Sequence, residues 1–302
     1  MLAPRPDQLL VRVEATSINF ADLSYGIGRP PPAGEPFVPG LDVAGTVETV
    51  GPDVTGWKEG DPVVALASRG AYAEFVPARP VLAYSPPKGI SMQEVASVPC
   101  VFLTAWYGLT KFAGTKSGET VLIHAGGSGV GVAGIQIARA LGARVITSAG
   151  SDAKLAKAKE LGAEAGVNYT TQDLTAELQR LTDGRGVDVV IDPVGGPIFD
   201  ATLPALATGG RVVTAGGPAG ARSDLDQAAL DARGQSVQQV GVFNDAAEDT
   251  DQSGWTQLKA WFEDGTIRPV VDRVLSWTQA DAAQRLLAER AVFGKVVLTV
   301  GG

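Results

Sequence analysis

A glycine-rich run at residues 126–131 is the part of the sequence best suited to chemistry. It reads Gly-Gly-Ser-Gly-Val-Gly, follows the apolar, β-branched stretch 120–125, and precedes an apolar segment of helical spacing that stops at Gly142. Backbone N–H groups at the positive end of a helix bind phosphate, and a side chain at that place would hold the phosphate away. This order of strand, turn and helix therefore predicts a dinucleotide site.

The pattern G-x-G-x-x-G fits this region in two ways. One uses Gly129, Gly131 and Gly134, and the other uses Gly126, Ser128 and Gly131 with serine in the middle. We favour the second, because it places the turn directly after the strand, and we expect Val130 to lie in the same turn. A tight turn that only allows close helix packing is the structural alternative. A second strand about twenty residues further on favours the dinucleotide site.

The end of that second strand, residues 143–148, predicts which dinucleotide is bound. An NAD site usually places Asp or Glu here to bind the ribose 2′-hydroxyl. The position falls at Ala149 and Gly150, and Ser151 and Lys154 lie just beyond. No carboxylate stands at the strand end to repel a phosphate, so the sequence predicts a 2′-phosphate pocket and NADPH. The alternative is that Lys154 is only a solvated charge on its helix.

Six segments of the chain, in order, carry a resemblance to a known family: residues 18–22, 39–45, 125–131, 161–163 with 168–169, 192–196, and 294–298. From Asn19 to Gly302 the chain resembles the zinc-free medium-chain dehydrogenase/reductases of the quinone oxidoreductase (zeta-crystallin) family. The resemblance implies an α/β fold with a Rossmann doubly wound parallel sheet and a GroES-like β-barrel catalytic domain. We expect the catalytic domain at 1–101 and 245–302, and the NADPH-binding domain at 102–244.

The resemblance also bears on metal binding. In the zinc alcohol dehydrogenases that resemble this chain, two cysteine ligands stand where this sequence has Asn19 and Leu41, and Cys100 is near the place of a third. One cysteine and one histidine in the whole chain supply too few soft ligands for a typical zinc site. We therefore expect no zinc. Asn19 becomes a candidate polar group near the nicotinamide or the substrate carbonyl, although a local turn or cap is the alternative role.

Further site residues follow from the resemblance alone. Thr104 stands at a position that touches the nicotinamide end, and Tyr25 is displaced by one position from a tyrosine of the family, which weakens it as a proton donor. His124, the only histidine, is expected to be structural. The remaining expected cofactor contacts are Tyr169 over the adenosine phosphate, Ala215, Gly216 and Gly217 as bare backbone beside the nicotinamide, Val242, Phe243, and Lys295 at a phosphate.

Composition limits the class of protein. A chain of 302 residues fits two domains, and its net charge of −8 gives no basic surface for nucleic acid. One cysteine cannot form an internal disulfide. No apolar run is long enough for a membrane span and no signal peptide opens the chain, so we expect a cytoplasmic protein. The family suggests a homodimer.

The strands and helices expected around these residues follow from periodicity. Short strands broken by turns in the first hundred residues predict a compact barrel. The chain starts roughly where a first hairpin of the family would end, so the barrel is short or the start is truncated. Expected strands are 9–15, 43–50, 61–66, 70–76, 143–148, 167–169, 187–192, 210–217, 240–243 and 296–300. Expected helices are 91–112 with the first turn broken at Pro99, 152–161, 255–262 and 280–289.

The function predicted from the sequence is an NADPH-dependent, zinc-independent oxidoreductase that transfers hydride to a quinone-type acceptor. The nicotinamide is expected to face Asn19, Cys100 and Thr104 in a cleft between the two domains. One alternative is a reductase of enones, 2-alkenals or enoyl thioesters, which needs a positioned proton donor. The other is a structural or regulatory nucleotide-binding protein without turnover.

Overall fold

The structure, a computed structural model, describes residues 4–27, 38–216 and 225–301, with the side chains of residues 24–27 left out. The chain divides into two compact units, each described separately below. Unit 1 comprises Met1–Leu103 and Val242–Gly302, and unit 2 comprises Thr104–Gly241. This division lies within three residues of the expected 102–244 for the second domain.

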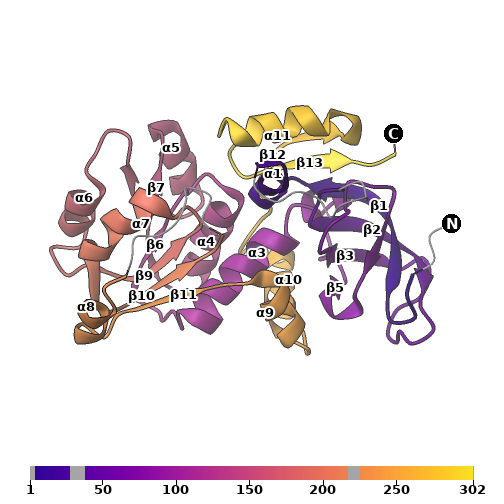
Figure 1. The fold of residues 1–302 in the computed structure, drawn as a ribbon, viewed down its shortest axis with the longest axis horizontal. Helices are drawn as coiled ribbons and strands as arrows, with labels where there is room; N and C mark the ends of the chain where they lie inside the picture. Colours follow the sequence, from indigo (N-terminus) through magenta and orange to yellow (C-terminus); the bar gives the residue numbers. More distant parts are fainter. Residues whose placement is uncertain (1–3, 28–37, 217–224, 302) are drawn as a thin grey trace. The chain divides into compact units, whose positions relative to one another are not determined.

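Unit 1 is built on a seven-stranded sheet that joins the two ends of the chain (Figure 1, indigo and yellow). The strand order is β12-β13-β1-β2-β3-β5, and β4 pairs with β1. Among the described residues these pairings form an open path rather than a closed ring. The strands are β1 (Leu9–Ser17), β2 (Asp42–Val50), β3 (Pro62–Leu66), β4 (Phe75–Ala78), β5 (Ala83–Tyr84), β12 (Val271–Ser276) and β13 (Lys295–Thr299).

The helices of unit 1 come from three separate stretches of the chain. They are α1 (Phe20–Ile27), α2 (Met92–Val95), most of α3 (Pro99–Tyr107), α9 (Val242–Glu248), α10 (Ser253–Glu263) and α11 (Ala280–Ala288). A core of buried aliphatic side chains from β1, β2 and β3 fills one face of the sheet. Val292, Val296 and Leu298 pack with Ile18 in a second cluster, which holds the C-terminal strand beside the start of α1.

Unit 2 is a six-stranded sheet in which every described pairing is parallel. Its order is β11-β10-β9-β6-β7-β8. Counted along the chain from β6, this is the doubly wound order of the Rossmann fold, so the predicted fold class is confirmed. The strands are β6 (Thr120–Ile123), β7 (Arg144–Ala149), β8 (Ala165–Asn168), β9 (Val187–Asp192), β10 (Leu206–Thr214) and β11 (Ser236–Gln239).

Helices follow the strands of unit 2, as parallel pairing requires. They are α4 (Gly129–Ala140), α5 (Asp152–Glu160), α6 (Leu174–Leu181), α7 (Gly196–Thr202) and α8 (Gln227–Ala232). The buried strands are near-continuous aliphatic runs, because both faces of a parallel sheet are covered. Strands β7 and β8 are added on one side of β6, and β9, β10 and β11 on the other, so the strand order reverses between β6 and β9. Open α/β sheets bind ligands at the carboxyl ends of the strands at such a point.

The observed elements differ from the expected ones at several places. The sixth strand is not 240–243 but β11 at Ser236–Gln239, and Val242 instead begins α9. The strand Ser-Val-Gln-Gln lies at the sheet edge with its last two residues exposed, so it lacks the apolar run that reveals buried strands. Residues 91–112 form α2 and α3, with the break before Pro99 that was expected, and then a π-helical turn at Gly108–Phe112 that was not. Strand β12 was not expected, because its exposed Arg273 and Val274 interrupt the apolar pattern.

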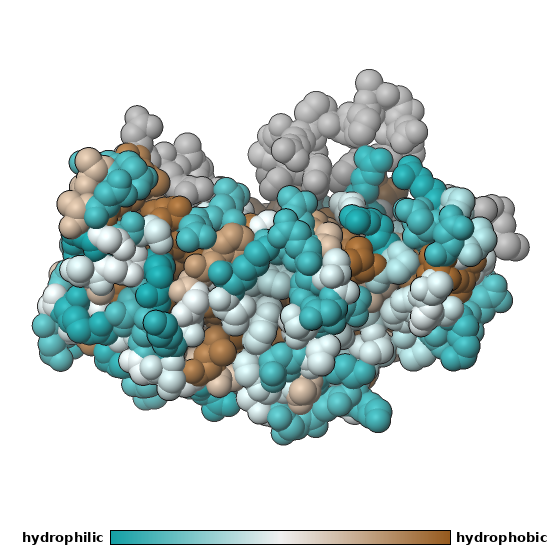
Figure 2. All heavy atoms as spheres, turned by 90° about the horizontal axis from the view of Figure 1, so that it is seen from below, coloured by the Kyte–Doolittle hydropathy of each residue, from teal (hydrophilic) through white to brown (hydrophobic). Residues whose placement is uncertain are grey.

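Polar and apolar side chains alternate over the surface. Figure 2 shows one face on which hydrophilic residues surround smaller hydrophobic areas. Phe20, Val38 and Val274 are the exposed large hydrophobic residues among those described. Within the described ranges, no helix combines the length and the apolar character that crossing a membrane requires.

Candidate functional site

The turn after β6 and the first turn of α4 each contain a glycine with no room for a side chain. A Cβ on Gly126 would lie 2.2 Å from Thr147 Oγ1, and one on Gly131 would lie 2.1 Å from the Ala125 carbonyl oxygen. The Gly126 amide donates to the Ser148 carbonyl at 2.9 Å, which fixes the turn against the neighbouring strand. Both positions belong to the favoured version of the glycine pattern.

The other version of the pattern identifies a different constraint. A Cβ on Gly134 would lie 3.1 Å from Ile123 Cδ1, so this glycine lets α4 pack closely on β6. Ser128 is the N-cap residue of α4, and its Oγ accepts from the Gly131 amide at 3.0 Å. The serine thus caps the helix, while the preceding glycines form the turn.

The chemistry of this turn fits a pyrophosphate. The first amides of a helix have no intrahelical acceptor, and they carry the positive end of the helix dipole. Gly129 and Val130 supply the first two amides of α4. No acidic side chain occurs between Ala125 and Gln136 to repel an anion. The turn therefore offers positively polarised amides without an acidic neighbour in the sequence, which suits a diphosphate.

The residues expected at the adenosine end lie together. A Cβ on Gly150 would lie 3.0 Å from the Tyr169 hydroxyl oxygen, so β7 and β8 bring this glycine and tyrosine into contact. Ser151 caps α5, and its Oγ accepts from the Lys154 amide at 3.4 Å. Gly150, Ser151, Lys154 and Tyr169 thus gather at the carboxyl ends of neighbouring strands.

One carboxylate near this group was not foreseen. Asp152 begins α5, and its Oδ1 accepts from Asn168 Nδ2 at 2.8 Å. Asn168 in turn accepts from the Thr170 hydroxyl at 2.6 Å, which fixes the amide. The acidic group that the strand end lacks therefore occurs three residues later, held by a bond to the neighbouring strand.

The expected nicotinamide contacts are divided between the two units. Ala215 and Gly216 follow β10, and the Ala215 amide donates to the Asp192 carbonyl at 2.9 Å. Gly216 has φ 83° and is exposed, with no atom within 4 Å of a Cβ there, so it leaves bare backbone. Gly217 lies outside the described residues. Thr104 is buried in α3 in unit 2, whereas Val242 and Phe243 form the first turn of α9 in unit 1.

His124 is held inside unit 2 by two hydroxyl groups. Thr202 Oγ1 donates to the Ile198 carbonyl at 2.8 Å, so it can only accept from His124 Nε2 at 2.9 Å. The proton is therefore on Nε2, and Nδ1 accepts from Ser148 Oγ at 2.7 Å. Burial lowers the pKa of His124, while the charge of Asp192 opposes that shift. Both nitrogens are occupied by neighbours, which fits a structural role.

In unit 1, Asn19 lies in a buried group of polar side chains, here named the Asn19 cluster: Ser17, Asn19, Asp42 and Lys295. Asp42 Oδ2 accepts from Asn19 Nδ2 at 2.7 Å and from Ser17 Oγ at 2.8 Å. Lys295 Nζ donates to Asn19 Oδ1 at 2.5 Å and to the Ile18 carbonyl at 2.7 Å. Asp42 Oδ1 accepts from the Cys100 amide at 2.6 Å, which ties the start of α3 to the cluster.

A second carboxylate holds the backbone around Asn19. Asp22 Oδ2 accepts from the Asn19 amide at 2.8 Å and from the Tyr72 hydroxyl at 3.0 Å. Its Oδ1 accepts from the Gly40 amide at 3.1 Å. Burial raises the pKa of Asp22 and, together with the charge of Asp22, the pKa of Tyr72. Tyr72 therefore keeps its proton and is a poor acid.

Lys295 and Asp42 were not recognised as neighbours of Asn19 from the sequence. Lys295 was expected at a cofactor phosphate, but its side chain is only 4% exposed and its described contacts are with Ile18, Asn19 and Asp42. A contact of Lys295 with a phosphate stays a prediction. Asp42 begins β2 directly before the buried Val43 and Ala44, and a carboxylate at the start of a buried segment was the available signal, since a buried carboxylate needs partners.

Two further expectations concern unit 1. The backbone of Tyr25 lies in α1, but its side chain is outside the described residues. Within the described part of the chain, no three His, Cys, Asp or Glu side chains gather in a group that could hold a metal ion.

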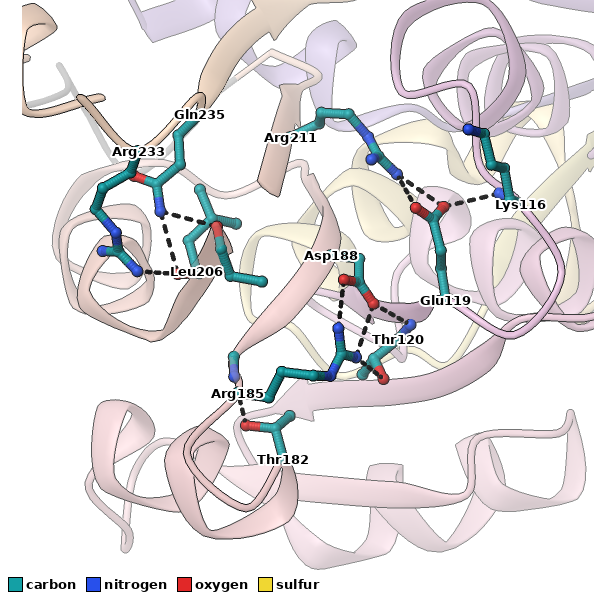
Figure 3. Close-up of polar contacts among 12 residues, drawn as sticks. Lys116, Glu119, Thr120, Thr182, Arg185, Asp188, Leu206, Arg211, Arg233 and Gln235 are labelled. Carbon is teal, nitrogen blue, oxygen red and sulfur yellow. Dashed lines mark hydrogen bonds and ion pairs between the residues drawn. The ribbon is translucent and has the colours of Figure 1, made fainter. Parts of the chain in front are cut away.

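The amino-terminal edge of the parallel sheet in unit 2 carries a different kind of polar group (Figure 3). We name Glu119, Thr120, Arg185, Asp188 and Arg211 the amino-edge cluster. Arg211 Nη2 contacts both oxygens of Glu119 at 2.7 Å. Arg185 binds Asp188 through two nitrogens at 2.6 and 2.8 Å. Burial opposes ionisation of Asp188, but bonds from Arg185 and the Thr120 amide leave its pKa lowered. These pairs join the starts of the central strands.

Two family models match the chain. The alcohol dehydrogenase GroES-like domain matches residues 5–101, and the zinc-binding dehydrogenase domain matches residues 129–260. The first match falls in unit 1 and the second lies mostly in unit 2.

Two relatives are of different kinds. Quinone oxidoreductase of Sus scrofa is 31% identical over 301 residues, which are 98% of this chain and 90% of that protein. The spectinabilin polyketide synthase system protein NorB of Streptomyces orinoci is 37% identical over 298 residues, 98% of this chain but 13% of that protein. The chain thus spans 10–13% of the length of the polyketide synthase relatives it matches.

Solved structures share the whole fold. Escherichia coli quinone oxidoreductase complexed with NADPH has a TM-score of 0.90 at 30% identity, over 99% of this chain and 93% of that one. CurK enoyl reductase has a TM-score of 0.87 at 27% identity, over 100% and 93%. A protein described as an NAD-dependent alcohol dehydrogenase has a TM-score of 0.88 at 36% identity, over 100% and 94%.

These matches cover both units, and the porcine relative is covered nearly end to end. The chain therefore belongs to the medium-chain dehydrogenase/reductase family and is quinone oxidoreductase-like.

Proposed function

We propose that this chain is an NADPH-dependent oxidoreductase that works without a metal ion and reduces a quinone-type acceptor. The observation that carries the proposal is Asn19, which stands where zinc-dependent relatives are expected to have a cysteine. Its amide is bonded to Asp42 on one side and to Lys295 on the other. An amide in these bonds can orient a carbonyl oxygen but supplies no thiolate for a metal.

Residues of unit 2 would hold the cofactor. The amides of Gly129 and Val130 would bind the pyrophosphate, because they are the first two amides of α4 and no acidic side chain stands beside them in the sequence. Ser151, Lys154 and Tyr169 would bind the 2′-phosphate. When bound, NADPH supplies the hydride. A quinone suits this site because it accepts hydride without strong stabilisation of an oxyanion, and water or a hydroxyl can supply the proton.

Steady-state kinetics with four acceptors tests the reaction. Consumption of NADPH would be followed with benzoquinone, naphthoquinone, a 2-alkenal and crotonyl-CoA, each over a range of concentrations. We expect the two quinones to give the highest kcat/KM. A higher kcat/KM with crotonyl-CoA or the 2-alkenal would reject the quinone assignment and leave the cofactor assignment intact.

The cofactor assignment has its own test at Lys154. We expect Lys154→Met to raise the KM for NADPH about tenfold, the effect of losing one charge-assisted hydrogen bond, and to leave the KM for NADH unchanged. Lys159→Met is the matched control, because Lys159 is an exposed lysine on the same helix. The wild type should also be compared with NADH, because one similar structure is described as NAD-dependent. A preference for NADH would overturn the assignment.

Metal independence is tested by analysis and by removal. We expect purified protein to contain far less than one zinc per chain, and activity to survive dialysis against a chelator. Stoichiometric zinc, or loss of activity that added zinc restores, would contradict the proposal directly.

An enoyl-thioester reductase is the second candidate. It is favoured by the likeness to NorB, a polyketide synthase system protein, and to CurK enoyl reductase. In that case the chain would work as one part of a larger assembly. A nucleotide-binding protein without turnover is the third, and tight NADPH binding with no consumption by any acceptor would identify it. A homodimer, expected from the family, would be measured by sedimentation equilibrium.

A further inference from the structure

The buried neighbours of Asn19 allow its amide only one orientation. Asn19 Nδ2 is 2.7 Å from a carboxylate oxygen of Asp42, and Asn19 Oδ1 is 2.5 Å from the Lys295 ammonium. Turning the amide by half a rotation would place its oxygen against the carboxylate and its NH₂ against the ammonium. Both hydrogen bonds would then become repulsions between like partial charges, so the charges on the two sides define the orientation.

Lys295 has the geometry of a fixed support. Its side chain is 4% exposed, and besides Asn19 it donates to the Ile18 carbonyl at 2.7 Å. Asp42 Oδ2 lies 3.6 Å from the same nitrogen, which balances the buried charge. The lysine is on β13 and Asn19 precedes α1, so the C-terminal strand of unit 1 holds this amide in place.

The amide has one hydrogen left to donate. Its oxygen accepts from Lys295, and one hydrogen of Nδ2 is donated to Asp42. The other hydrogen has only a long contact among the described residues, 3.5 Å to the Ser17 carbonyl. A hydrogen bond at that distance is weak, so this N–H remains able to donate to a ligand.

We infer that Lys295, together with Asp42, is a positioning residue that fixes the orientation of the Asn19 amide and so holds its remaining N–H in one direction. A group bound to that N–H is a hydrogen-bond acceptor, of the chemical class of a carbonyl oxygen. This inference rests on the proposed function, since it specifies how Asn19 would contribute to it. It assigns Lys295 a task different from the phosphate contact that the family resemblance suggested.

Replacing Lys295 separates the two tasks. In Lys295→Met we expect kcat with the best quinone to fall about tenfold or more, because the amide loses a charge-assisted bond that fixes it. The dissociation constant for NADPH, measured by nicotinamide fluorescence, should stay within error of the wild type. Lys259→Met, which removes a half-buried lysine of unit 1 that donates to Ser85 Oγ, is the control and should change neither quantity.

The opposite result would overturn the inference. If Lys295 binds a cofactor phosphate, Lys295→Met will weaken NADPH binding with little change in kcat at saturating cofactor. Should the methionine variant fail to fold, Lys295→Gln takes its place with the same two measurements, because glutamine keeps one N–H donor at similar reach without the charge.

An NMR measurement tests whether Lys295 fixes the Asn19 amide, and it needs no enzyme turnover. In ¹⁵N-labelled protein, the Nδ2 proton of Asn19 bonded to Asp42 should exchange slowly and shift downfield, and its signal is identified by its loss in Asn19→Asp. We expect this signal to move or broaden in the Lys295 variant and to stay unchanged in Lys259→Met. An unchanged signal in the Lys295 variant would reject the inference. A wild type that consumes no NADPH would reject the proposed function alone.

Discussion

The Asn19 cluster and the amino-edge cluster use the same kinds of charged group in opposite environments. Asp42 and Lys295 are 0% and 4% exposed in their side chains. In the amino-edge cluster, Arg185 and Asp188 are 54% and 16% exposed, and Arg211 and Glu119 are 25% and 19% exposed. The charges of the Asn19 cluster are buried away from water, whereas water partly screens the charges of the amino-edge cluster.

This difference assigns different tasks to the two clusters. A buried ion pair seldom adds net stability, because removing two charges from water costs about as much as their attraction returns. It does fix geometry, because every alternative leaves a charge without a partner. Exposed pairs can rearrange with little loss, so they join strands loosely. We therefore expect the chain to tolerate changes at the amino edge and to be sensitive at Asn19.

The largest effect is expected from removing Asp42. Asp42→Ala leaves the Lys295 ammonium buried without its carboxylate and leaves the Cys100 amide without an acceptor. We expect a loss of about 3–5 kcal/mol in the free energy of unfolding of unit 1. Urea unfolding followed by tryptophan fluorescence measures it, since Trp57 and Trp277 pack against the core of this unit. A loss no greater than that at Arg211 would remove the distinction between the clusters.

A buried group in unit 2 tests whether burial, rather than the unit, sets the size of the effect. Burial lowers the pKa of His124 below the ordinary 6.5, so the unfolded chain binds its proton at a higher pH than the folded chain does. Stability should be fully present above pH 6.5 and should fall as the pH drops below it, by up to about 1.4 kcal/mol per pH unit.

The variant His124→Gln provides the comparison for that pH dependence. It cannot take up a proton, so its free energy of unfolding should change less between pH 7.5 and pH 5 than that of the wild type. Denaturant unfolding at a series of pH values measures this. Parallel curves for the two proteins would show that His124 contributes nothing to acid sensitivity.

A smaller effect is expected at the partly buried pair of Arg211 and Glu119. Removing both partners singly and together should give a coupling energy of about 1 kcal/mol that decreases in high salt. Arg211 Nε is buried and has no hydrogen-bond partner among the described residues, so the pair carries a cost that limits its gain. A coupling as large as the loss at Asp42 would place this pair with the buried cluster.

The smallest effect is expected at the exposed pair of Arg285 and Asp281 on α11. Their side chains are 66% and 69% exposed, so water replaces the interaction when it is removed. Arg285→Ala should leave the thermal midpoint within the error of the measurement at physiological salt. A clear decrease in the midpoint would show that the size of the effect at Asp42, His124, Arg211 and Arg285 does not follow their exposure.

Much of unit 2 could be predicted because its determinants are local. The strand, the turn at Gly126 and Gly131, and the helix after them are encoded within about two dozen residues, and the 2′-phosphate pocket was predicted in the next strand and helix. Edge strands were harder, because an edge strand such as β11 buries little and shows little apolar pattern. Its true register came only from pairing with β10.

The Asn19 cluster could not be predicted from local sequence patterns. Asn19 itself could be proposed from its place after the first strand, but Lys295 is 276 positions away and Asp42 is 23 away. The sequence alone determined the glycine turn, the alternation of unit 2 and the scarcity of metal ligands, because these depend on residue type and short spacing. Only the tertiary structure decided which way the Asn19 amide points, because that depends on buried charges brought together by the folding of β1, β2 and β13.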